Sequence, residues 1–69
     1  MNEQLASEIV SSAIALDKAL GLLDTIISGI PDMKERAQFA RHLGDIVGQV
    51  NECFIRPLVK RYPDLEPNN

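Results

Sequence analysis

The chain has 69 residues, a formal net charge of -3, one cysteine and one histidine. A chain of this length forms one domain at most, and on folding alone it buries only about 60% of its unfolded surface. Cys53 has no cysteine partner, which excludes an intrachain disulfide, and the acidic total disfavours nucleic acid as a partner. Because small domains need a disulfide, a metal or a further subunit, the sequence predicts oligomerisation, most simply a homodimer.

Targeting signals are not expected in this sequence. Residues 1–8 carry two glutamates and no Lys or Arg before the first apolar segment, unlike a secretory signal peptide. Five charged residues interrupt the first half of the chain: Glu3, Glu8, Asp17, Lys18 and Asp24. They leave no stretch of the roughly 18 apolar residues that a membrane span needs. Together with an unpaired thiol, these features predict a cytoplasmic protein without a membrane partner.

The first predicted helix spans about residues 3–28. Its apolar residues recur at steps of three, four or seven: Leu5, Ile9, Leu16, Leu20, Leu23, Ile27 and Ile30. This stripe predicts one buried side. Val10 and Ile14 project from the far side of the stripe, where they are either scattered surface aliphatics or a second contact surface for a partner.

A turn is predicted at residues 29–31. Gly29 is expected to end the first helix in the left-handed conformation, and Pro31 cannot continue it. Asp32 followed by Glu35 is a capping box, which predicts the start of a second helix. A short connection of this kind brings two helices back antiparallel. One continuous kinked helix is the disfavoured alternative.

The second predicted helix spans about residues 32–61, with a kink near Pro57 because an interior proline removes one backbone hydrogen bond. Residues 63–69 contain two prolines and predict an extended or disordered tail. Tyr62 and Leu65 are weak candidates for partner binding, beside Val10 and Ile14.

More than half of the circumference of the second helix is apolar or small, which is too much for one neighbouring helix to cover. The predicted fold class is therefore all-α, an antiparallel helical hairpin over residues 1–62 that dimerises into a four-helix bundle. The candidate dimer interface lies along the second helix: Phe39, Leu43, Ile46, Val50, Cys53 and Phe54. Charge suits such packing, since residues 1–31 hold four acidic residues against Lys18, whereas residues 32–62 hold six basic against four acidic ones.

Two glycines four residues apart, Gly44 and Gly48, weaken the second helix by about 1 kcal/mol each relative to alanine. A helix that keeps such residues is expected to have a neighbour whose backbone approaches closely, and the returning first helix is one candidate.

No residue set predicts catalysis, a metal or a cofactor. His42 shares its helical side with Gln38, Asp45 and Gln49, which predicts a solvated imidazole. It lies about 16 Å along the helix from Cys53, too far for the two to bind one ion. Cys53 is expected to be a small buried hydrophobe. No serine has a histidine nearby in sequence to act as a base.

The expected function is accordingly that of a small non-catalytic protein–protein interaction or regulatory module that acts as a homodimer. One alternative is an RNA- or DNA-binding regulator that uses a basic strip on the second helix. The strip would consist of four residues: Arg41, Arg56, Lys60 and Arg61. The other alternative is a hairpin subunit of a complex with a different, unidentified protein.

Overall fold

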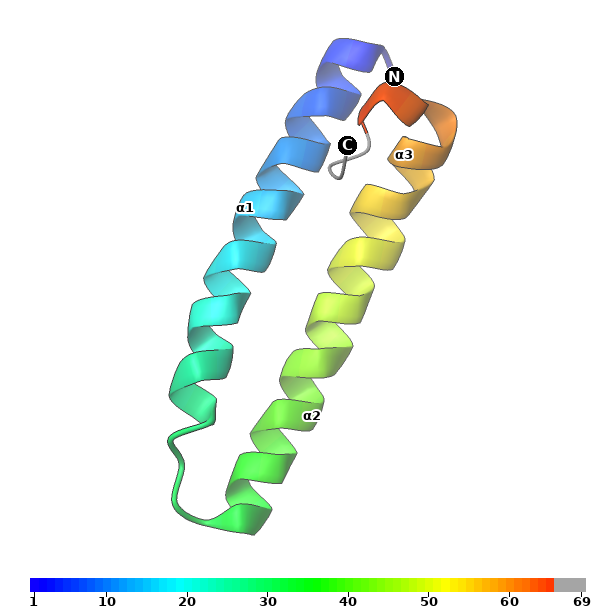
Figure 1. Ribbon diagram of the computed structural model, residues 1–69. Coiled ribbons are helices and arrows are strands. Elements are labelled where there is room, and N and C mark those ends of the chain that lie inside the picture. Colours follow the sequence, from blue (N-terminus) through cyan, green and yellow to red (C-terminus); the bar gives the residue numbers. More distant parts are fainter. Residues whose placement is uncertain (66–69) are drawn as a thin grey trace.

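The computed structural model describes residues 1–65, and every regular element in this range is a helix. The prediction of an all-α chain with two long helices is confirmed. The elements in chain order are α1 (Glu3–Ile27), α2 (Met33–Val50), the π-helix η1 (Asn51–Ile55), α3 (Arg56–Arg61) and the 3-10 helix η2 (Pro63–Leu65). Figure 1 shows α1 and α2 side by side and antiparallel, joined by one loop at the end opposite to the N-terminus.

Side-chain caps fix where the two long helices begin. The Asn2 side chain accepts a hydrogen bond from the Leu5 amide (2.8 Å), and the Asp32 side chain accepts one from the Glu35 amide (3.2 Å). Each bond satisfies one of the first amides of a helix, which have no carbonyl partner within the helix itself.

The predicted left-handed conformation of Gly29 is wrong, because none of the described glycines has a positive φ. The last turn of α1 instead tightens into 3-10 bonds, in which the Gly29 amide donates to the Ile26 carbonyl (3.0 Å) and the Ile30 amide to the Ile27 carbonyl (3.0 Å). Arg36 then reaches back from α2 and donates to the Ile30 carbonyl (3.1 Å). These bonds end the helix without glycine's conformational freedom.

The seam between the two long helices is narrow and built from few side chains. Among the described residues, the buried apolar set is Ala6, Val10, Ala13, Ile27, Leu43 and Val50. Two of these six are alanines, whose side chains bury little area between the helices. The predicted stripe of α1 was expected to be buried, yet Leu5, Leu16 and Leu23 are exposed. The seam runs along one edge of that stripe and leaves the other edge open.

Just before Pro57, near which a kink is predicted, the helix widens into a π-turn. In η1 the Arg56 amide donates to the Asn51 carbonyl, five residues back rather than four. Pro57 has no amide hydrogen, and in an α-helix its ring would clash with the carbonyl of the residue four before it. A π-turn, which holds one residue more than an α-turn, relieves this conflict and lets the chain continue into α3.

The two ends of the described chain meet at one end of the hairpin. The Tyr62 hydroxyl donates a hydrogen bond to the Met1 carbonyl (2.7 Å), which links residues 61 positions apart. Figure 1 shows α3 beside the beginning of α1. The predicted tail thus begins as η2, whereas residues 66–69 lie outside the described part of the chain.

The molecule is long and thin, with extents of 46 × 19 × 16 Å. Its radius of gyration is 14.6 Å, against about 11 Å for a compact domain of this length. Within residues 1–65, no helix is both long and apolar enough to cross a membrane.

Candidate functional site

The most prominent surface feature is an apolar surface along one side of the hairpin, which we call the apolar face. Its members on α1 recur at steps of seven. Its members on the returning helix lie opposite them, and residues of both helices line two shallow grooves. The apolar face consists of seven side chains: Ile9, Leu16, Leu23, Ile30, Phe39, Ile46 and Phe54. A repeat of seven is the spacing that keeps a helix in continuous contact with an antiparallel or parallel neighbour.

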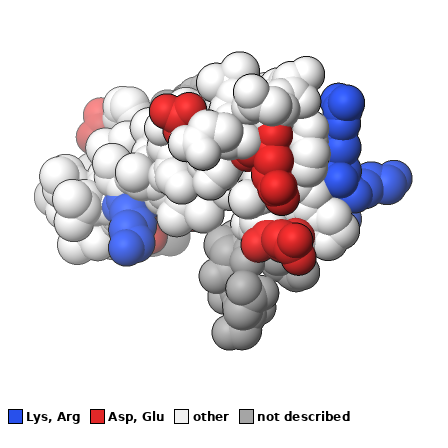
Figure 2. Space-filling view, turned by 90° about the horizontal axis from the view of Figure 1, so that it is seen from above, with Lys and Arg blue, Asp and Glu red and all other residues white. Residues whose placement is uncertain are grey.

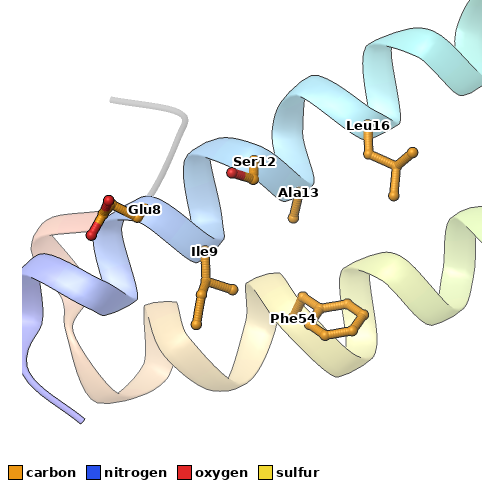
Figure 3. A pocket seen from close by; sticks show the side chains of 6 residues that line it. All are labelled: Glu8, Ile9, Ser12, Ala13, Leu16 and Phe54. Carbon is orange, nitrogen blue, oxygen red and sulfur yellow. The ribbon is translucent and has the colours of Figure 1, made fainter.

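The first groove lies near the N-terminal end of α1. Figure 3 shows Ile9, Ala13 and Leu16 pointing from α1 toward the helix that carries Phe54. Glu8 and Ser12 also line this groove. Phe54 keeps 52% of its surface exposed, although it stands beside three apolar side chains of α1.

The second groove lies near the turn, and its lining is almost entirely apolar. From α1 and the residues just after it, the groove takes Leu23, Ile27 and Ile30. From α2 it takes Phe39, His42, Leu43 and Ile46, so His42 is its one polar side chain. Phe39 and Ile46 remain 49% and 47% exposed, which means that the hairpin covers only half of each.

The π-turn decides which residue completes the apolar face on the returning helix. Continuing the step of seven from Phe39 and Ile46 leads to Cys53, which was predicted to lie in the dimer interface. The π-turn adds one residue, so the next position on the face is taken by Phe54, eight residues after Ile46. Cys53 is exposed and lines a different groove, together with Gly44, Gly48 and polar side chains. The expectation of a buried Cys53 is therefore wrong.

The six candidate interface residues divide into two main groups, with Cys53 outside both. Phe39, Ile46 and Phe54 lie on the apolar face, and about half of each side chain is exposed. Leu43 and Val50 are each only 6% exposed, because the hairpin itself buries them. These two belong to the seam between the helices. Sequence reasoning missed the contribution of α1, namely Ile9, Leu16 and Leu23, although their spacing of seven residues was visible in the sequence.

Of the weak candidates for partner binding, two lie on α1 and two near the C-terminal end of the described chain. Val10 is only 3% exposed, so its placement on the far, solvated side of α1 is wrong. Ile14, Tyr62 and Leu65 are half-buried, and the Tyr62 hydroxyl is already engaged by Met1. The sequence pattern of α1 alone could not reveal this, because α1 also contacts η1, which is an irregular turn.

Three of the four basic residues of the nucleic-acid alternative lie together in α3, namely Arg56, Lys60 and Arg61, whereas Arg41 lies apart on α2. Arg56 pairs with Glu52 (2.6 Å), and Arg61 lies over the ring of Tyr62 (5.6 Å to its centroid). Arg41 precedes Arg56 by roughly 22 Å of helix, and it shares its surface with Asp32 and Glu35. Figure 2 looks onto the end where the termini meet and shows Lys and Arg at two separate places with Asp and Glu between them.

The three glycines within the long helices have open space around them. A methyl group added at Gly21, Gly44 or Gly48 would meet no atom within 4 Å outside the helix's own backbone. The expectation that the returning first helix approaches Gly44 and Gly48 closely is therefore wrong. Gly21 and Gly44 line a groove on the other side of the seam, together with Asp17, Asp24 and apolar residues of both helices.

The apolar face offers contact area rather than reactive groups. Within residues 1–65 no three His, Cys, Asp or Glu side chains gather as a metal site would require. Comparison of the chain with protein-family models, with curated proteins and with solved structures finds no match to any of the three. The function is therefore inferred from the geometry of the apolar face.

Proposed function

We propose that the protein is a small non-catalytic protein–protein interaction module, which pairs with a second copy through the apolar face to form a four-helix bundle. The observation that carries this proposal is the row of half-exposed Leu, Ile and Phe side chains on both helices of one side of the hairpin. Contiguous exposed apolar surface of this kind marks sites of protein association.

The exposed area supports association. The chain exposes 5365 Å², whereas a compact monomer of 7.6 kDa exposes about 4,300 Å². The excess of about 1,000 Å² is close to the roughly 800 Å² that each partner buries in a standard protein interface. This excess, together with the small core of the hairpin, supports the proposal that a further chain covers part of its surface.

The absence of charge on the apolar face supports a second copy of the chain as its partner. None of its seven members is charged, so two copies of an acidic chain (net charge -3) can meet there without opposing like charges. The centres of homodimer interfaces are depleted of charge in the same way. Two-fold pairing, the commonest arrangement, requires a surface that is complementary to itself. Stacking two antiparallel hairpins gives each helix two neighbours, as in a four-helix bundle.

Sedimentation equilibrium between 1 and 100 μM tests the proposal. We expect about twice the chain mass of 7.6 kDa. Ile46→Glu puts a charge in the middle of the apolar face and should yield a monomer. Leu22→Glu is the matched control, because Leu22 is 70% exposed and, being one residue from Leu23, lies about 100° away around the helix. This control should sediment as the wild type does.

A well-folded wild-type monomer at 100 μM would overturn the homodimer. It would favour the hairpin as a subunit that waits for a different protein to cover the same face. An Ile46→Glu variant that still dimerises would show instead that the copies meet elsewhere on the surface.

A further inference from the structure

His42 stands on α2 between two members of the apolar face. It follows Phe39 by three residues and precedes Ile46 by four, so the three side chains stand on the same side of α2. It lines the second groove, where each of its six fellow lining residues is apolar. In the hairpin alone the imidazole is exposed. A helix that covers Phe39 and Ile46 must also cover the residue between them.

The side chains that line the groove offer a proton on His42 no compensation. Across the groove, the side chains that face it are Leu23, Ile27 and Ile30, none of which ionises. On α2 itself the nearest carboxylate on the same helical side is that of Asp45, three residues later, and the next is that of Glu35, seven residues earlier. Neither lines the groove. A second copy would bring an apolar face whose grooves carry a single carboxylate, that of Glu8.

We propose that His42 makes dimerisation sensitive to pH, so that acidification separates the two hairpins. This inference rests on the proposed function, because it needs a second copy over the apolar face. An imidazole enclosed by apolar side chains is favoured in its neutral form, since burial disfavours the charged one. The dimer therefore holds while His42 is neutral, and it weakens as the pH falls through the range in which histidines take up a proton.

The composition of the chain makes this effect easy to isolate. His42 is the only histidine. Ordinary carboxyl groups titrate near pH 4, whereas amino-terminal amines, thiols, lysines and arginines titrate at about pH 8 or above. A change in association between pH 7.0 and pH 5.5 therefore reports mainly on this one side chain, which is present twice in each dimer.

The test is the dissociation constant of the full chain, measured by sedimentation velocity over a concentration series at pH 7.0 and pH 5.5 and constant ionic strength. For the wild type we expect the constant to rise by at least about tenfold at pH 5.5, because two protonated imidazoles must each lose a proton before the dimer can form. His42→Gln keeps a polar side chain of similar size that cannot take up the proton. It should dimerise at pH 7.0 and change less than about twofold at pH 5.5.

The other outcomes separate this inference from the proposed function. A wild-type dimer that is equally tight at both pH values would overturn the role of His42 and leave the dimer standing. The role of His42 would also be overturned if His42→Gln weakened with acidity as much as the wild type, because carboxylates such as Glu8 or Asp45 would then be responsible. A wild-type monomer at both pH values would overturn the proposed dimer and the inference with it.

Discussion

At the scale of single residues, the turn between the long helices depends on side-chain hydrogen bonds. Asp32 caps the first turn of α2, and Arg36 holds the Ile30 carbonyl from six residues away. The spacing of Asp32 and Glu35 is a local signal that sequence reasoning can use. The bond from Arg36 has no such signal, because it depends on how the loop folds back. The expected glycine conformation was wrong for the same reason, since these bonds allow another path.

Gly29 provides the prediction at this scale. Its φ is not positive, and an added methyl group would come no closer than 3.4 Å to the Ile26 carbonyl oxygen. Gly29→Ala should therefore leave the free energy of unfolding unchanged or raise it by up to about 1 kcal/mol, because alanine restricts the unfolded chain. Asp32→Ala should lower it by about 1 kcal/mol through loss of the cap. Urea denaturation measures both changes. A clear loss of stability in Gly29→Ala would indicate that Gly29 adopts the left-handed conformation after all.

At the scale of helices, the sequence predicts where the elements lie better than which sides they bury. Caps and apolar periodicity indicate two long helices, but the periodicity assumes a constant number of residues per turn. The π-turn at η1 breaks that assumption and exchanges Cys53 for Phe54 on the apolar face. The π-turn also explains why the burial of Val10 could not be predicted. Val10 lies in the part of α1 near this irregular turn and α3, and the apolar periodicity of α1 does not show what packs there.

The burial of Val10 gives the prediction for the helices. Val10→Ala removes two carbon atoms from a side chain that is 3% exposed. It should lower the free energy of unfolding by about 2 kcal/mol, from lost burial and the cavity left behind. Leu22→Ala removes a larger apolar group from the exposed surface of the same helix and should change the free energy by less than about 0.5 kcal/mol. Equal losses in urea denaturation would contradict the placement of Val10 in the core.

At the scale of the whole molecule, the hairpin is unusually extended for its length, and few side chains are buried within it. The sequence indicates this shortage through an apolar arc on the second helix that is too wide for one neighbour. Of the six residues that it assigns to the exposed surface, Phe39, Ile46 and Phe54 do lie on the apolar face. Leu43 and Val50 are buried within the chain instead, and α1 supplies one isoleucine and two leucines to the face. If association completes the core, stability must depend on concentration.

Thermal unfolding tests this dependence. Two chains that unfold together have an unfolding enthalpy of about 100 kcal/mol. A hundredfold increase in protein concentration should then raise the melting temperature by about 10 °C. Circular dichroism at 2 and 200 μM measures the shift, with Ile46→Glu as the variant expected to show none. A wild-type melting temperature that is independent of concentration would mean that the hairpin is stable alone.

The hydrogen bond between Tyr62 and Met1 also has a consequence for the chain's topology. Because it brings the two ends of the described chain together, a short peptide joining them would close the hairpin into a ring with one link at each end. The ring could then be cut in the loop at residues 28–32, giving a circular permutant in which α2 precedes α1. Every helix would keep its neighbours in this permutant. The packing of the helices would therefore not depend on their order along the chain.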